Sequence, residues 1–402
     1  MPVFVWEAVT KKDEVKKGEM EAVDEAAVRG LLRRQGYKSI EVKQKPKDIL
    51  EYLPFLKPKI KEKNVVVFCR IFSTMINAGL PLIQCLDLLA QQEQNKAFSK
   101  IIKSVKEDIE GGNSLTNALK KYPNLFDDLF VNLIAAGEAG GILDVILERL
   151  SNYLEKAMKL KAKVKGAMTY PAAVLGISVC VVILLLYKVI PVFKKMFESM
   201  GGELPALTQL LITASEFTQK YILFIIAIFV ALFIAFKRFY KTEKGKWTID
   251  SLVLKAPVFG ELLKKVAIAK FARTLSTMMS SGVPILEGLS IVSKTSGNIV
   301  IENALMKTRQ SISEGRSIAE PLEETKLFPP MVVQMIAVGE ATGALDSMLS
   351  KIANFYDDEV DVAVEAMTAL LEPVMMVFLG GVVGGMIVAM YLPIFKLASV
   401  VG

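Results

Sequence analysis

The sequence predicts a mainly α-helical membrane protein with two homologous cytoplasmic helical bundles, three transmembrane helices and a small N-terminal α+β module. Three observations lead to this fold class. The chain of 402 residues is 52% hydrophobic and has a positive mean hydropathy, which is typical of membrane proteins. Three apolar runs are long enough to cross most or all of a bilayer. One stretch of helical sequence occurs twice, which indicates an internal duplication.

The duplication is clearest in two segments that begin 202 residues apart. Ile134–Leu150 reads IAAGEAGGILDVILERL, and Ile336–Ile352 reads IAVGEATGALDSMLSKI. We interpret each copy as a helix that ends at Gly-Glu-Ala and restarts at Gly-x-Leu-Asp, with glycines free to take a positive φ. The glycines expected at the break are Gly137 and Gly339, and those expected in the second turn are Gly141 and Gly343. The chain is therefore expected to use one unit twice, a helical bundle followed by a membrane span.

Residues 1–45 are predicted to form the small α+β module. Alternating apolar residues near the start predict a strand with one apolar side. The residues on that side are Phe4, Trp6 and Ala8. A second strand is expected to be broken by Gly18, and a helix and a last strand follow. Residues 46–63 carry several prolines among lysines and are assigned to a linker.

The two helical bundles are assigned to residues 64–168 and 265–370. Near the start of the first, Phe68-Cys-Arg-Ile-Phe-Ser-Thr-Met corresponds to Phe271-Ala-Arg-Thr-Leu-Ser-Thr-Met in the second. Apolar residues at helical spacing run through this motif and predict a helix in each copy. Later in the first bundle, Ser114 follows two glycines and is a candidate N-cap.

The three apolar runs are assigned to transmembrane helices over residues 171–193, 221–239 and 373–395. At about 1.5 Å per residue, runs of this length cover most or all of a hydrocarbon core of about 30 Å. The duplication continues into the first and third spans, because Pro171 corresponds to Pro373 at their starts.

Basic residues near the spans predict the orientation in the membrane. Five lysines precede the first span, namely Lys156, Lys159, Lys161, Lys163 and Lys165. Five basic residues follow the second apolar run, namely Lys237, Arg238, Lys241, Lys244 and Lys246. The positive-inside rule then places both bundles and the N-terminus in the cytoplasm. The loop of residues 194–220 and the short tail of residues 396–402 are then on the outer side of the membrane.

The composition removes several classes of chemistry. The chain has no histidine, which excludes the catalytic triads and zinc motifs that depend on one. It has no phosphate-binding loop motif, and its three cysteines form no C-x-x-C pair. We expect no enzyme activity and no catalytic, cofactor-binding or metal site. The net charge of +7 is concentrated beside apolar runs, which favours membrane orientation over nucleic-acid binding.

Thirteen residues are candidates for structural or partner contacts rather than for catalysis. They are Gly137, Glu138, Gly141, Gly339, Glu340, Gly343, Pro171, Glu372, Pro373, Gly380, Gly381, Gly384 and Gly385.

Each group of candidates has two interpretations. Glu138 and Glu340 either place a carboxylate near the N-terminus of the next helix or face a partner or the sister bundle. The four glycines of the third span form overlapping G-x-x-x-G patterns, which suit helix packing either within one chain or between subunits. Glu372, at the edge of that span, is either an interfacial carboxylate or a partner for a cation on another transmembrane helix.

The two repeats differ in charge where they approach the membrane. The first approach carries the five lysines, and its counterpart carries acids, namely Asp357, Asp358, Glu359, Asp361 and Glu365. Both segments could simply be solvated, with the lysines attracted to anionic lipid. The alternative hypothesis is that the two segments attract each other, within or between subunits.

Taken in this order, the motifs resemble the inner-membrane platform proteins of type IV pilus and type II secretion machines, the PilC/GspF family. The similarity covers essentially the whole chain. It rests on the paired Phe-x-Arg-x-x-Ser-Thr-Met and Gly-Glu-Ala-x-Gly-x-Leu motifs, on Tyr170-Pro171, and on Leu204-Pro205-x-x-Thr208. Where the first span has Tyr170, the third has Glu372, which departs from the repeat.

The resemblance implies a non-catalytic assembly platform of the bacterial inner membrane that forms homo-oligomers, with the loop of residues 194–220 and the tail of residues 396–402 in the periplasm. Its cytoplasmic bundles would contact a hexameric assembly ATPase, and its spans would contact pilin or pseudopilin transmembrane helices and other inner-membrane components. No nucleic-acid partner and no cofactor are implied. The alternative function, a small polytopic transporter or channel, is disfavoured because the spans are few and nearly free of charge.

Overall fold

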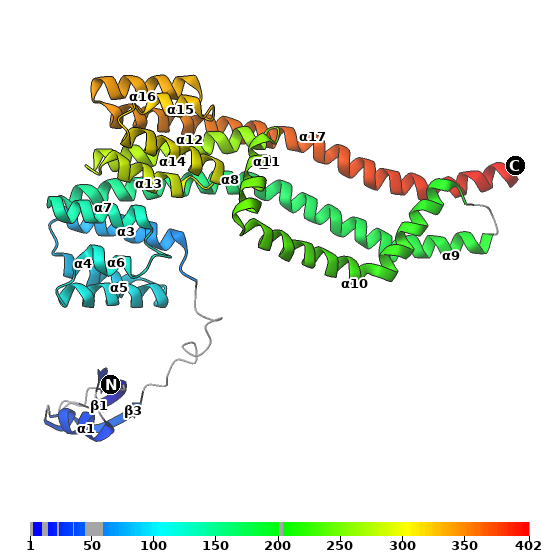
Figure 1. Cartoon of the computed structure of the whole chain (residues 1–402). Helices are drawn as coiled ribbons and strands as arrows, with labels where there is room; N and C mark the ends of the chain where they lie inside the picture. The colour runs from blue at the N-terminus through cyan, green and yellow to red at the C-terminus, as the bar shows by residue number, and fades with distance from the viewer. Residues whose placement is uncertain are drawn as a thin grey trace. The chain divides into compact units, whose positions relative to one another are not determined.

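The computed structural model describes residues 3–9, 15–21, 24–34, 36–44, 59–200 and 204–401, which are drawn in Figure 1. Most of the predicted linker and part of the predicted periplasmic loop and tail lie outside these residues. The described chain is mainly helical, with a small sheet near the N-terminus and three helices that could cross a membrane. The predicted fold class is therefore confirmed.

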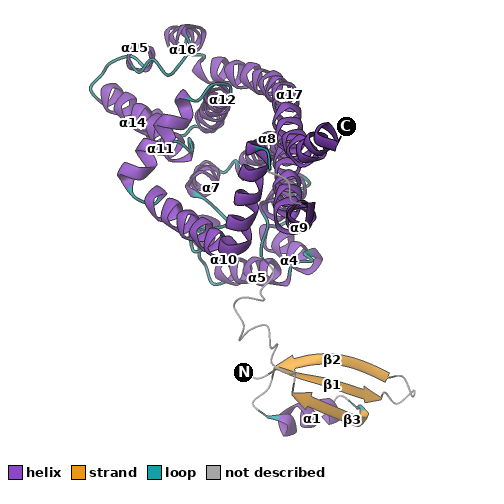
Figure 2. Cartoon of the chain, turned by 90° about the vertical axis from the view of Figure 1, so that its right-hand side faces the viewer, coloured by secondary structure: helices purple, strands orange, loops and turns teal. Residues whose placement is uncertain are grey.

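The N-terminal module consists of a three-stranded antiparallel sheet and one helix (Figure 2). Its elements are β1 (Val3–Val9), β2 (Val15–Glu21), α1 (Glu25–Arg34) and β3 (Lys38–Gln44). The strand order is β2-β1-β3, so β1 lies in the centre. The apolar side of β1 and the inner face of α1 bury a small core made of Phe4, Val28, Leu32 and Val42.

Gly18 does not break β2, contrary to the expectation from its residue type. It lies in the middle of the strand and pairs with Trp6 on β1. A Cβ at this position would come within 2.6 Å of the Trp6 ring. The glycine is therefore required by the indole that covers it and not by a turn.

The first helical bundle contains five helices and the beginning of a sixth. They are α3 (Glu62–Asn77), α4 (Leu82–Gln92), α5 (Lys96–Glu110), α6 (Leu115–Lys120), α7 (Asp128–Gly140) and α8 (Leu143–Leu184). Aromatic rings link α3 to the start of α7, with Phe68 and Phe126 ring centroids 6.2 Å apart. Ser114 caps α6 as predicted, because its hydroxyl accepts a hydrogen bond from the Asn117 N–H at 3.2 Å.

The second bundle repeats the same order of helices after the additional helix α11 (Glu243–Lys255). Its members are α12 (Phe259–Ser280), α13 (Ile285–Thr295), α14 (Ile299–Ser313), α15 (Ala319–Glu324), α16 (Pro330–Thr342) and α17 (Leu345–Val401). The ring contact of the first bundle recurs between Phe271 and Phe328, whose centroids are 5.1 Å apart. The duplication seen in the sequence is therefore a duplication of structure.

Each bundle continues into the membrane region without a break. Helix α8 has 42 residues and α17 has 57, which corresponds to about 63 Å and 85 Å of helix. Pro171 and Pro373, which were expected to begin separate spans, lie inside these helices. Figure 1 shows both helices leaving the bundles in the same direction. What the sequence divides into bundle and span is one continuous element in each repeat.

The segment between the first two spans is mostly helical and not an extended loop. Helix α8 passes through one π-helical turn, η2 (Leu185–Val189), into α9 (Ile190–Met200). The next helix, α10 (Ala206–Tyr240), begins 15 residues before the apolar run of the second span. The polar residues in this first part of α10 contact the helices on either side, as described below.

Candidate functional site

The repeated joint lies between α7 and α8 and again between α16 and α17. Gly141 ends α7 with φ 66°, and Gly343 ends α16 with φ 70°. Both are in the left-handed region, where a glycine is favoured because it has no Cβ. The joint is thus placed correctly by the sequence motif, but the turn occurs at its last glycine.

Gly137 and Gly339 do not mark the break, which corrects the expectation that they take a positive φ. Both lie inside helices and are buried. A Cβ on Gly137 would lie 3.1 Å from Cβ of Ile146, and one on Gly339 would lie 3.0 Å from Cα of Leu345. These glycines allow the helix before the joint to pack closely against the helix after it.

Glu138 and Glu340 cap helices, although not the helices that follow them in the chain. The carboxylate of Glu138 accepts hydrogen bonds from the backbone N–H groups of Leu115 at 2.7 Å and Thr116 at 2.9 Å, and from the Thr116 hydroxyl. Glu340 accepts from the N–H of Ile318 at 3.0 Å. Each carboxylate therefore satisfies free N–H groups at the start of the short preceding helix, α6 or α15, where negative charge is stabilising.

The arginine of each Phe-x-Arg motif links the first helix of its bundle to the long helix. Arg70 donates to Glu155 and to Asn152 at 2.6 Å each. In the second repeat, Arg273 donates to Asp357 and to Asn354. The hydrogen bond from Arg70 holds the pKa of Glu155 below its usual value. Arginine suits this position because its planar group can donate to two acceptors at once.

Helices α8 and α17 are joined side by side just before the membrane region. Lys156 donates to the side-chain oxygen of Asn354 at 3.3 Å, and Lys163 forms an ion pair with Asp361. Both pairs are separated by 198 residues, so the two helices run parallel. This ion pair supports the hypothesis that the basic and acidic segments attract each other within one chain. It accounts for only part of the two segments, because Glu359 pairs instead with Lys265 at 2.8 Å.

The π-helical turn and the proline that follows it leave two carbonyl groups without helical partners. The N–H of Ile190 bonds to Leu185, not to Leu186, and Pro191 has no N–H to offer. The carbonyls of Leu186 and Tyr187 therefore lack the N–H group four residues later that an α-helix would supply. Two polar side chains of α10 occupy them, since the Ser215 hydroxyl donates to Leu186 and the Gln219 amide donates to Tyr187 at 2.9 Å.

The second repeat has a related arrangement at Pro393, which lies inside α17 without a π-helical turn. Four residues earlier, the carbonyl of Ala389 accepts a hydrogen bond from the Thr208 hydroxyl of α10. The side chains of Thr208 and Ser215 are each 2% exposed. Helix α10 thus holds both long helices at the carbonyls that their prolines release, which compensates the loss of backbone hydrogen bonds. Thr208 was recognised from the sequence only as part of a motif, and Ser215 and Gln219 were not among the candidate residues.

The glycines of the third span have no packing partner within the described chain. A Cβ on Gly380, Gly381, Gly384 or Gly385 would meet no neighbouring atom within 4 Å. Glu372 is exposed on the surface of α17. Pro171 is buried, whereas its counterpart Pro373 is exposed. These observations leave the glycine face of α17 open to lipid or to another chain.

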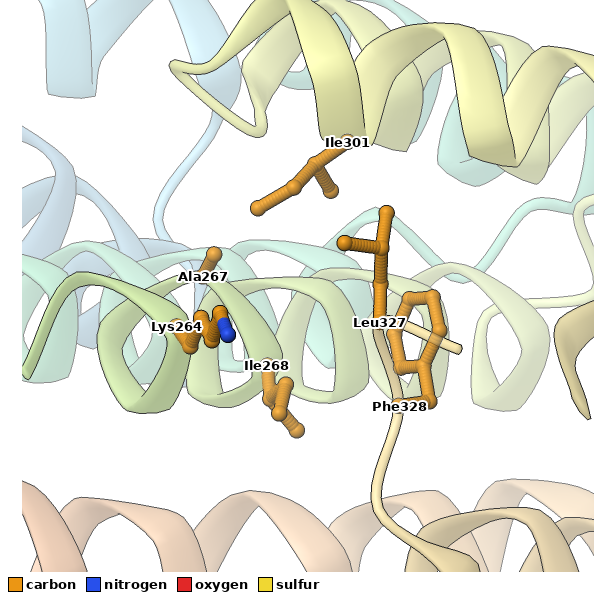
Figure 3. A pocket seen from close by; sticks show the side chains of 6 residues that line it. All are labelled: Lys264, Ala267, Ile268, Ile301, Leu327 and Phe328. Carbon is orange, nitrogen blue, oxygen red and sulfur yellow. The ribbon is translucent and has the colours of Figure 1, made fainter. Parts of the chain in front are cut away.

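The second bundle has an open cleft of about 770 Å³ between α11, α14 and α15, lined by Trp247, Met306 and Gln310 among others, and a much smaller cavity in its core. Figure 3 shows an apolar cavity between α12, α14 and the segment before α16, lined by Ile268, Ile301 and Phe328 among others. Its volume of about 10 Å³ is at most that of one water molecule. Within the described ranges, no group of three or more His, Cys, Asp or Glu side chains is placed to hold a metal ion.

Comparison with known proteins identifies both repeats. The family model for type II secretion system protein F matches the chain twice, over residues 68–191 and 271–393, and the model for the N-terminal domain of that protein matches residues 1–43. The chain is 51% identical over 401 residues to the type IV pilus assembly protein PilC of Myxococcus xanthus, covering 99% of this chain and 95% of that protein.

Two further relatives show the range of the similarity. The PilC protein of Pseudomonas aeruginosa is 43% identical over 376 residues, which cover 93% of this chain and all of that protein. The type II secretion system protein F of Vibrio cholerae is 31% identical over 403 residues, covering 99% of this chain and 98% of that protein. The match therefore extends over whole chains in both groups.

Proposed function

Since this chain belongs to the type II secretion system protein F family, we propose that it is the non-catalytic inner-membrane platform of a type IV pilus machine. The platform couples a cytoplasmic hexameric ATPase to the insertion or extraction of pilin subunits at the membrane. The identity to the pilus assembly proteins, 51% and 43%, is higher than the 31% identity to the secretion protein, which supports the pilus machine.

The observation that carries this proposal is the continuity of α8 and α17 from each bundle into its span. Force applied to a bundle passes directly along a helix into the membrane region, with no flexible connection in the described residues. The capped joints fix each bundle to the start of its long helix. The ion pair between Lys163 and Asp361, with the α10 contacts near the far ends, makes the two long helices move together.

The same proposal includes the topology. The bundles and the N-terminus lie in the cytoplasm, and the connection between α9 and α10 and the C-terminus lie in the periplasm. The basic residues that follow α10 and precede the first span support this orientation. A reporter enzyme that is active only in the periplasm should work when fused after residue 402 and fail when fused at the N-terminus.

The test of function uses the full chain in lipid nanodiscs together with the pilus assembly ATPase from the same organism. The proposal predicts a stable complex with the ATPase and no ATP hydrolysis by the chain alone. Hydrolysis by the purified chain, or solute flux through liposomes that contain only this protein, would contradict the platform function. An unrelated three-span membrane protein in the same nanodiscs controls for adhesion of the ATPase to lipid.

A further inference from the structure

The second repeat packs onto the first through α12 and α8. The Thr274 hydroxyl donates to the Tyr153 hydroxyl at 3.1 Å, and the Arg149 guanidinium donates to the Ser280 carbonyl. Residue numbers rise along α8 as they fall along α12, so these helices are antiparallel. Thr274 is 1% exposed, so the contact is fully closed at its centre. The last helix of the first repeat, α8, thus contacts the first helix of the second repeat, α12.

The duplication produces a second copy of the α12 face on α3. The counterparts of Lys270, Thr274 and Thr277 are Val67, Ile71 and Thr74. These positions form one stripe of the α3 helix, with a spacing of four and then three residues. Val67 is 44% exposed and Ile71 is 37% exposed, whereas Thr274 is buried. The stripe on α3 is therefore the unused equivalent of a buried interface.

The duplication also produces a second copy of the α8 face on α17. The counterparts of Arg149, Tyr153 and Leu160 are Lys351, Phe355 and Val362. Leu160 is 8% exposed in the first repeat, but Val362 is 59% exposed and Phe355 is 45% exposed in the second. The second repeat thus exposes large apolar side chains where the first repeat has Tyr153, which contacts α12, and the buried Leu160.

We propose that the α3 stripe of one chain packs antiparallel on the α17 face of a second copy, in the way that α12 packs on α8 within the chain. The register of the internal contact brings Ile71 to Phe355 and Asn77 to Lys351. The hydroxyl pair of Thr274 and Tyr153 in the internal contact thus corresponds to the apolar pair of Ile71 and Phe355 in the contact between copies. The two surfaces are therefore complementary to each other and buried apolar area stabilises the contact.

Charge and membrane geometry agree with this arrangement. In the same register, the exposed Lys63 of α3 lies opposite the exposed Glu365 of α17. Because α8 and α17 are parallel, the rotation and translation that superimpose the first repeat on the second keep the two spans in the same direction. Applying the same movement once more places the first repeat of a second copy beside the second repeat, with its spans in the same bilayer. The interface joins two different faces, so it is heterologous and can extend to further copies. This inference deepens the proposed platform function by assigning a surface to the homo-oligomer that the family resemblance implies, and it rests on that function.

Cysteine cross-linking of the full chain in native membranes tests the interface. In a Cys180→Ser background, the pair Ile71→Cys and Phe355→Cys should give intermolecular disulfides on mild oxidation with copper phenanthroline. Dimers and longer multimers are expected, and the cross-link should also form between two co-expressed chains that carry one cysteine each. The internal pair Tyr153→Cys and Thr274→Cys controls for oxidation, and Ile71→Cys with Met306→Cys, an exposed residue of α14, controls for random collision.

Three outcomes would overturn the proposal. One is no cross-link from Ile71 and Phe355 while the internal pair oxidises. Another is self-cross-linking of the Ile71→Cys chain alone, which indicates a symmetric contact. The third is capture of a different protein by Ile71→Cys. As a second arm, Lys63→Glu should reduce the cross-link at least about threefold and Glu365→Lys should restore it, since opposite charges attract across such contacts. ATPase binding by the same variants separates failure of this interface from failure of the platform function.

Discussion

Removal of the Glu138 carboxylate is the most informative single change at the joint. In the structure this carboxylate accepts two backbone N–H groups and one hydroxyl at the start of α6. The variant Glu138→Ala leaves those donors without a partner from the protein. Glu340→Ala removes the corresponding carboxylate of the second bundle, which accepts from the Ile318 N–H, and serves as the matched control.

The size of the effect follows from the lost contacts. Loss of a helix N-cap costs about 0.5–2 kcal/mol, and hydrogen bonds to a charged group are at the upper end of the usual range. Leu115, whose N–H faces Glu138, is 1% exposed, so water replaces the carboxylate poorly. We expect a loss of about 2 kcal/mol in the stability of the first bundle, which is about a 30-fold change in an opening equilibrium.

The buried thiols of the first bundle provide the assay. Cys69 and Cys85 are both fully buried, and burial raises the pKa of Cys69 to about 12, so labelling requires the bundle to open. The second bundle contains no cysteine. In a Cys180→Ser background, Glu138→Ala should therefore speed thiol labelling about 30-fold, whereas Glu340→Ala should leave it unchanged. Equal labelling rates in Glu138→Ala and the parent, or equal acceleration by both variants, would refute the capping role.

Three other predictions concern the remaining contacts. Ser215→Ala should lower the free energy of unfolding of the full chain by about 1 kcal/mol, as measured by thermal unfolding in detergent. Adding Pro191→Ala should reduce that loss because it restores a backbone donor. Thr213→Ala, whose hydroxyl bonds within its own helix, is the control. Gly141→Asn should be tolerated because asparagine accepts a left-handed backbone, whereas Gly137→Asn should speed Cys85 labelling because its Cβ meets Ile146; equal effects of the two would contradict the geometry. The pKa of Glu155 is lowered in the folded state, so its contribution to folding stability is present above about pH 4.5 and is lost as pH falls through the folded-state pKa. The difference in thermal stability between the parent and Glu155→Gln, measured by circular dichroism, should therefore shrink between pH 7 and pH 3. A constant difference would count against the Arg70 contact.

The fold was predictable because its main determinants are local or repeated in the sequence. Long apolar runs predict the transmembrane helices, and a motif that recurs at Phe68 and Phe271 indicates two equivalent bundles. The cap at Ser114 follows from its position after two glycines. The boundary between bundle and span was not predictable, since Pro171 and Pro373 favour a helix start in water but are accommodated inside a long helix here.

The contacts of the site depended on tertiary structure that sequence patterns do not show. The sequence placed the joint but not its turning residue, because a glycine required by a positive φ looks the same as one required by close packing. One of the two interpretations of Glu138 placed its carboxylate at the following helix, whereas the fold brings it to the preceding helix, α6. The α10 contacts had a usable signal, since a proline in a helix leaves the carbonyl four residues earlier without its usual donor. Polar residues on a neighbouring helix, such as Gln219 at Tyr187 and Thr208 at Ala389, can supply that donor.

The central claim is that continuous helices carry motion from the two helical bundles into the membrane. Its most direct test is the insertion of four glycines into α8 after Lys165, which interrupts the helix because glycine disfavours it by about 1 kcal/mol per residue. The same insertion between α9 and α10 is the control. The account predicts that the α8 insertion abolishes pilus assembly in cells while membrane insertion and ATPase binding stay at the parental level, and that the control assembles pili. Parental pilus assembly by the α8 insertion variant would contradict it.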